Sequence, residues 1–374
     1  MTNSLLIYRL TGSTVLLGTL AIAQSLPILL FSIYGGLVAD RLRKKHVLLV
    51  SFGGQAAITL AVALALISGY LSPQNVGSWW VLIATSFLQG SITAFMMPAQ
   101  RAVIPEIVNR ELVTNAVALN TMGQNVLRLL APASTGFLID AFGFPAVFLV
   151  MSGLYMIGMA FVAFIPLTAK AVTQAGGTLA DIREGFRYMW RENIILFILA
   201  WSFCGQAAIA IFSRLMPIFA DDILKVGAKG MGLWLSVSGA GAIVSSLTFA
   251  SLSPRRRGFT HVSGSIVMAL SIIGFSFNRS WYPSLVLMFF QGLGSTTGRM
   301  MGEALLQDYT EAEYRGRVFG IHVMEQGLTG ISAFLIALLA AAIGAPMSIG
   351  GCATFMILLG IMTLVFNSQY RRLA

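Results

Sequence analysis

The residues GLVADRLRKK at positions 36–45 place one carboxylate and four cations between two long apolar segments. The first segment covers approximately residues 14–38 and the second approximately residues 47–69. An α-helix needs about 20 apolar residues to cross the hydrocarbon core of a bilayer, and both segments reach that length. A short cationic connection between two such helices is typical of a cytoplasmic loop in an integral membrane protein.

The composition of the whole chain supports a membrane location. Apolar residues make up 57% of the 374 residues and charged residues only 10%, whereas soluble domains carry about 25% charged residues. We therefore predict an all-α integral membrane protein whose partner is the lipid bilayer. The two cysteines, Cys204 and Cys352, lie far apart in apolar segments, so no disulfide framework, metal site or cofactor is expected.

Eleven apolar segments are predicted to span the membrane as helices, because each is close to the length that a bilayer requires. The predicted spans cover residues 14–38, 47–69, 79–97, 117–140, 146–166, 194–212, 231–252, 260–277, 282–302, 318–343 and 346–367.

The distribution of positive charge predicts the orientation of these spans. Most of the 24 Lys and Arg residues fall in alternate connections and in the C-terminal tail, and cytoplasmic loops collect such residues. The C-terminus is therefore expected on the cytoplasmic side of an inner membrane. The positive net charge then reflects topology, and no nucleic acid partner is expected. The opposite side is predicted to carry Arg9, Arg214, Lys225, Lys229 and Arg279.

One long cytoplasmic connection divides the chain. Within residues 167–193, apolar side chains recur at helical spacing between charged ones, which predicts an amphipathic helix lying at the membrane surface. We predict an N-terminal bundle of five spans in residues 1–166, this linker in residues 167–193, and a C-terminal bundle of six spans in residues 194–374.

Several loops resemble those of the major facilitator superfamily. Residues 36–45 are similar to the loop signature G-x-L-a-D-r-x-G-r-k, with Arg43 in place of the second glycine. The sequences PAQR at 98–101 with NAVALN at 115–120, and RGRVFG at 315–320, are similar to two further loops of one branch, the bacterial enterobactin and macrolide exporters. The resemblance implies a major facilitator fold of two pseudo-symmetric helical bundles and a monomeric secondary transporter of small molecules.

The main departure from that family is at the N-terminus. The predicted spans correspond to the second to twelfth helices of the family, and only Leu5 to Tyr8 resembles the tail of the first. Because the family's first helix lines the central cavity, its loss would expose polar cavity residues to lipid. We therefore expect a start site placed too far downstream, or a fragment, rather than a true product of eleven spans.

The resemblance also implies a conformational latch in the first cytoplasmic loop. Asp40 would form salt bridges between the bundles that stabilise the outward-facing state and loosen during transport. The alternative is that the cations serve only to fix the topology. The predicted latch residues are Gly36, Asp40, Arg41, Lys44 and Lys45. Arg315 and Arg317 belong to another predicted cytoplasmic loop, which is similar to the loop between the family's tenth and eleventh helices.

A polar stripe in the predicted span 117–140 is a candidate for the substrate cavity. Asn120, Gln124 and Arg128 are spaced i, i+4 and i+8 and therefore share one helix face. A charge at membrane depth marks a functional site by default, and the alternative is a structural arginine that joins helices. Gln24, Gln89 and Gln291 are weaker candidates for the same cavity, which is otherwise rich in Met and Phe.

Four residues are candidates for proton coupling. Glu325 lies inside a span with His322 three residues before it, and such a pair could take up and release a proton. The alternative is that both line a wet vestibule. Arg299 and Glu303 form an i, i+4 pair that either takes part in coupling or neutralises itself. The predicted span 79–97 lacks the charged residue that many proton antiporters carry there, so proton antiport is implied by the branch alone.

These observations predict a proton-coupled exporter of amphipathic small molecules such as drugs, macrolides or siderophores. The alternative is a truncated or regulatory membrane protein without transport activity. An enzyme is not expected, because the sequence contains no P-loop, H-E-x-x-H or G-x-S-x-G motif.

Overall fold

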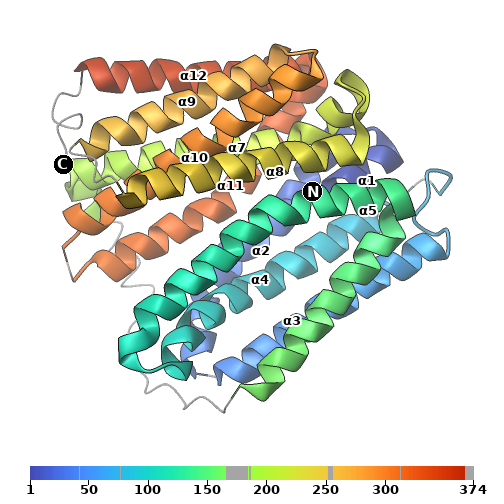
Figure 1. Ribbon diagram of the computed structural model, residues 1–374, viewed down its shortest axis with the longest axis horizontal. Helices are drawn as coiled ribbons and strands as arrows, with labels where there is room; N and C mark the ends of the chain where they lie inside the picture. The colour runs from blue at the N-terminus through green and yellow to red at the C-terminus, as the bar shows by residue number, and fades with distance from the viewer. Residues whose placement is uncertain are drawn as a thin grey trace.

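The computed structural model describes residues 1–41, 43–75, 77–165, 184, 187–251, 256–311 and 313–366. The described part of the chain is helical and contains no β-strand, which confirms the predicted all-α class (Figure 1). Its elements are α1 (Thr2–Thr11), α2 (Thr14–Arg41), α3 (Lys44–Ile67), α4 (Trp80–Ile107), η1 (Arg110–Leu112), α5 (Val113–Phe164), α7 (Asn193–Ile218), η2 (Phe219–Ile223), α8 (Gly227–Ser251), α9 (Arg257–Phe277), α10 (Trp281–Tyr309), α11 (Arg315–Ile343) and α12 (Ala345–Phe366).

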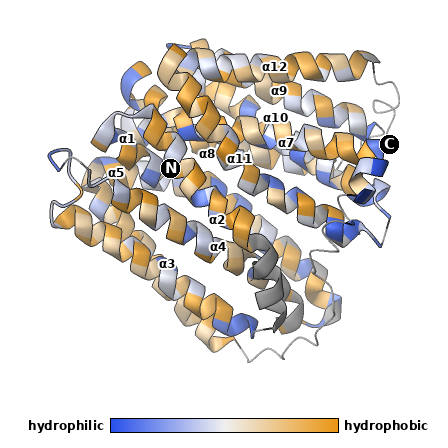
Figure 2. Cartoon of the chain, turned by 180° about the vertical axis from the view of Figure 1, so that it is seen from behind, coloured by the Kyte–Doolittle hydropathy of each residue, from blue (hydrophilic) through white to orange (hydrophobic). Residues whose placement is uncertain are grey.

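Nine helical stretches of the described residues are long and apolar enough to cross a membrane. Two predicted spans, 117–140 and 146–166, are joined in α5, which turns sharply at Gly143 (φ 78°, ψ 176°). A positive φ of this kind favours glycine, and Pro145 begins the second arm. The predicted span 282–302 lies in α10, which is not among the nine. Figure 2 shows apolar residues along the helices and hydrophilic residues gathered near their ends.

The helices pack in two groups that meet along two helix pairs. Helix α3 packs against α4 and α5, and α2 against α4, while α10 packs against α7, α8 and α9 (Figure 1). Between the groups, α2 packs along α11 and α5 along α8. A Cβ atom on Gly232 would overlap the carbonyl oxygen of Pro132, and one on Gly330 would overlap Ser25. Glycine therefore allows the close helix approach that dominates packing in membranes.

The two ends of this interface differ. Near α1 and η2 the groups are tightly packed, and Leu5 and Phe219 are fully buried. At the opposite end the first arm of α5 leaves its neighbours, because residues 119–124, more than one full helical turn, are all exposed, with Leu119 at 71% and Met122 at 64%. The structure is therefore closed at the end that holds α1 and open at the end that holds the Arg-rich connections.

An aromatic cluster supports the closed end. The rings of Trp234 and Phe212 pack edge-on against Phe275, with centroid distances of 5.0 and 5.1 Å. Phe219, the first residue of the π-helical turn η2, joins the same ring at 5.4 Å. Edge-to-face pairs of this kind add to the stability gained by burial. The cluster fixes the end of α7 and thereby positions the acidic residues of η2.

One charge lies in a different place from the one predicted. Arg214 was expected in a connection on the outer side, but it lies inside α7, which continues to Ile218. Residues 167–183, 185 and 186 of the predicted linker lie outside the described residues, and residues 187–191 are helical.

Candidate functional site

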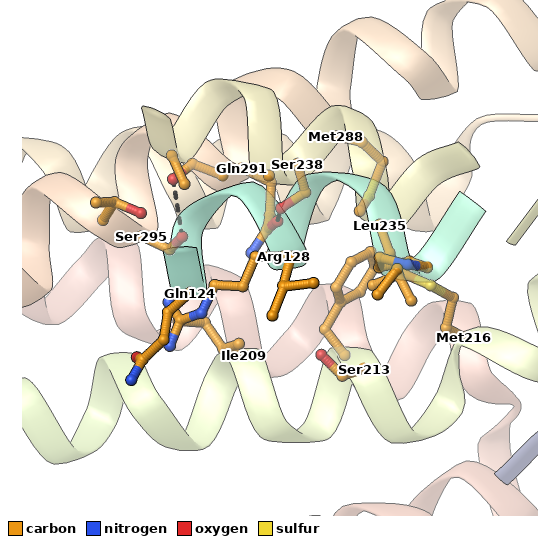
Figure 3. A pocket seen from close by; sticks show the side chains of 18 residues that line it. Gln124, Arg128, Ile209, Ser213, Met216, Leu235, Ser238, Met288, Gln291 and Ser295 are labelled. Carbon is orange, nitrogen blue, oxygen red and sulfur yellow. Dashed lines mark hydrogen bonds between the residues drawn. The ribbon is translucent and has the colours of Figure 1, made fainter. Parts of the chain in front are cut away.

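A cavity of about 660 Å³ lies between α5 of one group and α7, α8 and α10 of the other (Figure 3). This volume falls in the range of small-molecule sites, about 300–1,000 Å³. The cavity is lined by Gln124, Leu127, Arg128, Ala131, Pro132, Ile209, Phe212, Ser213, Met216, Leu235, Ser238, Gly239, Ala242, Met288, Gln291, Gly292, Ser295 and Thr296.

Three of the predicted cavity residues meet here. Gln124 and Arg128 extend from one face of α5 into the cavity, and Gln291 enters from α10 (Figure 3). The hydroxyl of Ser238 on α8 donates a 2.7 Å hydrogen bond to Oε1 of Gln291. Among the described lining residues, Arg128 alone carries a formal charge. The cavity therefore combines one cation, several neutral hydrogen-bonding groups and an apolar wall.

Arg128 stands where α5 begins to separate from α8. A Cβ on Gly239 would meet the carbonyl oxygen of Arg128 at 3.0 Å, so the backbones touch at this level. Beyond it, Pro132 interrupts the hydrogen-bonding pattern of α5, as proline does inside a helix. The nearby Ala133 N–H donates to Oγ of Ser236 on α8 at 3.0 Å. Pro132 thus lies where the two groups are joined.

The other predicted cavity residues lie elsewhere. Gln24 on α2 accepts a short hydrogen bond from the guanidinium of Arg214. Oε1 of Gln89 accepts a hydrogen bond from Nδ2 of Asn3 at 3.2 Å. Asn120 is exposed at the open end of α5 and does not line the cavity. Of the three polar residues predicted to share one face of α5, only Gln124 and Arg128 therefore line the cavity.

Arg214 is a functional candidate that the sequence analysis missed. Its bond to Gln24 links α7 with α2 and so joins the two groups. The residue lies two positions after the predicted end of its span, where a charge is readily assigned to a loop. The sequence does indicate that the helix continues past Arg214, because the residues that follow it are apolar as far as Phe219.

A polar cluster lies next to the cavity, among α7, α9, α10 and α11. Nδ1 of His322 lies 3.0 Å from Oε2 of Glu325, and both side chains are largely buried, at 12% and 7% exposed. Arg299 and Glu303 approach within 3.6 Å on α10. A small void joins Arg299 and His322 to His261, which is buried on α9 and was not predicted as a candidate. Ile209 and Ser295 border both this void and the cavity.

The first cytoplasmic loop is described only in part. Gly36, Asp40 and Arg41 belong to the end of α2, but their side chains lie outside the described part of the chain. Lys44 is buried. Nζ of Lys45 donates to the carbonyl oxygens of Ala163 and Ile165, both at 2.7 Å. Lys45 therefore caps the end of α5, where a cation is favoured by the helix dipole.

Arg315 and Arg317 lie at the turn between α10 and α11. Nε of Arg315 donates to the carbonyl oxygen of Thr310 at 3.2 Å, and Nη2 of Arg317 lies 3.2 Å from Oε2 of Glu184. The ring of Tyr188 stacks on Tyr314 with centroids 4.1 Å apart. The described part of the connecting segment is thus anchored to this turn.

At the closed end, two pairs of side chains connect α1 to η2. Nε and Nη2 of Arg9 donate to the two carboxylate oxygens of Asp221 at 2.8 and 3.0 Å, and the Tyr8 hydroxyl donates to Asp222. We refer to these four residues as the outer clamp, after the side of the membrane that the charge distribution predicts for this end. Burial, followed by the adjacent Asp222, raises the pKa of Tyr8 above its ordinary value, and the hydrogen bond to Asp221 raises the pKa of Arg9.

The sequence analysis missed the acidic half of the outer clamp. Its signal was the pair of adjacent acids at positions 221 and 222, in a chain with only 14 acidic residues. Among the described residues, no group of three or more His, Cys, Asp or Glu side chains is placed to hold a metal ion.

Comparison with known proteins identifies relatives over most of the chain. The staphyloferrin A transporter of Staphylococcus aureus is 23% identical over 376 residues, which cover 96% of this chain and 89% of that protein. Macrolide efflux protein A of Streptococcus pyogenes is 22% identical over 320 residues, which cover 83% of this chain and 77% of that protein. These relatives confirm the resemblance inferred from the loop motifs.

The fold is also that of solved transporters. The inward open structure of the xylose transporter XylE from Escherichia coli matches with a TM-score of 0.71 and 14% identity, covering 94% of this chain and 86% of that one. The family model described as transmembrane secretion effector matches residues 1–371. The chain therefore belongs to the transmembrane secretion effector family of major facilitator superfamily transporters.

Proposed function

We propose that the protein exports amphipathic small molecules, such as drugs, macrolides or siderophores, by alternating access driven by protons. The observation that carries this proposal is the cavity between α5 and the helices α7, α8 and α10. Alternating access requires a site between two groups of helices that rock against each other, and this cavity lies between the two packing groups. The exporting relatives support the direction of transport.

The proposal includes the membrane orientation and the domain division predicted from the sequence. With the Arg-rich connections and the C-terminus in the cytoplasm, the open end faces the cytoplasm and the structure corresponds to an inward-open state. A bundle in residues 1–166 and another in residues 194–374 then rock about the α2–α11 and α5–α8 pairs. A monomer contains both bundles, so all the residues that line the described cavity come from one chain.

We assign proton coupling to His322 and Glu325. Their 3.0 Å approach and low exposure support the assignment, because a buried carboxylate next to an imidazole can exchange a proton near neutral pH. Arg299 on α10 lines the same small void as His322, and Ser295, one helical turn before Arg299, lines both this void and the cavity. We assign Asp40 and its loop the role of a latch between the bundles, which loosens when the His322–Glu325 pair takes up or releases a proton.

Transport by inside-out membrane vesicles tests the proposal. Vesicles from cells that express the chain, and from cells with an empty vector, are energised by respiration and supplied with radiolabelled erythromycin, ethidium or enterobactin. Accumulation of at least one probe above the empty-vector level, lost when a protonophore is added, is the expected result. No accumulation of any probe would favour a membrane protein without transport activity. Accumulation that resists the protonophore would contradict proton coupling alone.

A further inference from the structure

The guanidinium of Arg128 faces the cavity without a carboxylate partner among the described residues. Three other arginines illustrate the usual arrangement: Arg9, Arg257 and Arg317 are each paired with an acid, Asp221, Asp308 and Glu184 respectively. For Arg128 the described part of the chain contains no such ion pair, and the other described residues that line the cavity are uncharged. Its charge is therefore directed at whatever fills the cavity.

The nearest ionised groups do not cancel this charge. Arg299 and Glu303 approach each other within 3.6 Å on α10 and so neutralise one another. Gln124 lies one helical turn before Arg128 on the same face of α5, and its amide can donate a hydrogen bond to the same ligand atom as the guanidinium. The site therefore presents a net positive charge with a neutral donor beside it.

The opposite wall of the cavity is apolar. Phe212 and Met216 of α7, Leu235 of α8 and Met288 of α10 line it, and flexible thioethers next to aromatic rings accept apolar groups of varied shape. Arg128 is exposed to the cavity, and a cation within a membrane-spanning helix is unfavourable unless water or an opposite charge approaches it. A ligand with a carboxylate or sulfonate at one end and an apolar body at the other satisfies both walls.

We propose that the preferred substrates are amphipathic organic anions and that Arg128 binds their acidic group. The inference rests on the proposed export function and narrows it, because amphipathic amines would meet a like charge in the cavity. A planar guanidinium can hold a carboxylate through two parallel hydrogen bonds. Hydrogen bonds to charged groups of this kind correspond to roughly a 10- to 100-fold difference in affinity.

The test compares two probes that share one apolar body. Pyrenebutyric acid and pyrenebutylamine differ in the charge of the terminal group, and their binding is measured on the purified full-length protein in lipid nanodiscs. We expect the acid to bind at least about tenfold more tightly than the amine. In Arg128→Gln this preference should disappear, while Arg128→Lys should retain part of it. Arg279→Gln, which removes a cation from the exposed α9–α10 turn, is the matched control and should behave as the native protein.

Tighter binding of the amine, or unchanged binding of the acid in correctly folded Arg128→Gln, would overturn the inference. Transport of both probes by membrane vesicles distinguishes failure of the anion-binding inference from failure of the proposed export function. Export of the amine but not of the acid would refute the anion preference and leave export standing. Binding of the acid that depends on Arg128, with export of neither probe, would support the anion site and refute the export function.

Discussion

The outer clamp predicts how the two conformations of the transporter are balanced. Asp221→Asn keeps the shape of the side chain but removes the charge that Arg9 contacts at 2.8 and 3.0 Å. A hydrogen bond to a charged group contributes about 1.5–3 kcal/mol to stability. Because the side chains of Arg9 and Asp221 are 38% and 19% exposed, solvent screening lowers the contribution of this pair. We estimate a loss of about 1 kcal/mol, which is about fivefold in the equilibrium between closed and open outer ends.

Labelling of a buried cysteine at the closed end measures this equilibrium. Ala228 on α8 is 1% exposed and its carbonyl oxygen adjoins Gly136 of α5, so a cysteine at position 228 reacts with a membrane-impermeant maleimide only when this end opens. With Ala228→Cys as background, Asp221→Asn should raise the labelling rate about fivefold. Asp308→Asn is the matched control, because its Arg257 partner lies in the same group of helices.

An unchanged or lower labelling rate in Asp221→Asn would refute the idea that the pair holds the outer end closed. An equal increase in Asp308→Asn would show that loss of any ion pair loosens the protein. Arg9→Gln provides a further check, since the double variant should resemble either single variant if the two residues act only through each other.

Three further predictions concern the cytoplasmic half and the polar cluster. Glu325→Gln should abolish substrate-induced proton release from proteoliposomes while leaving binding intact, and normal release would refute its coupling role. Asp40→Asn should slow transport several-fold without changing substrate affinity, so an unchanged initial rate would leave the loop only a topological role. Lys45→Met should lower the free energy of unfolding by about 1–2 kcal/mol, because two carbonyl oxygens at the end of α5 lose a charged donor. Thermal unfolding of the protein in nanodiscs measures this loss, and an unchanged unfolding midpoint would contradict the capping role.

The apolar segments predict most of the fold, because span length and loop charge are properties of short stretches of chain. The predicted spans coincide with helices, and their errors lie at the ends. The sequence predicts a connection between residues 140 and 146, where the apolar segments end and begin. In the structure both helical arms of α5 extend further into this connection than predicted, and only Gly143 has a non-helical backbone conformation. Which helices pack against each other depends on contacts between distant residues, and no local pattern contains that information.

The cavity could be predicted only where its residues share one helix. The spacing of Gln124 and Arg128 identifies a polar face of α5, but it does not identify the α7 and α8 residues that complete the cavity. Asn120 obeys the same spacing and still lies outside, because α5 separates from α8 before that turn. The apolar wall is invisible in the sequence for a different reason, since Phe212 and Met216 resemble lipid-facing residues of the same span.

The largest error in reading the sequence concerns the end of α7, and it has a physical cause. A span predicted from hydropathy ends at the first charge, on the assumption that the charge seeks water. Here three polar residues beyond position 212 instead bond to the N-terminal helices: Arg214 to Gln24, Asp221 to Arg9 and Asp222 to Tyr8. Each contact joins one of the N-terminal helices α1 and α2 to the end of α7 or to η2, so this is where closure of this end of the molecule gains its polar interactions. When the outer end opens, all three contacts must exchange their partners for water, and the energy of that exchange sets the balance between the two states.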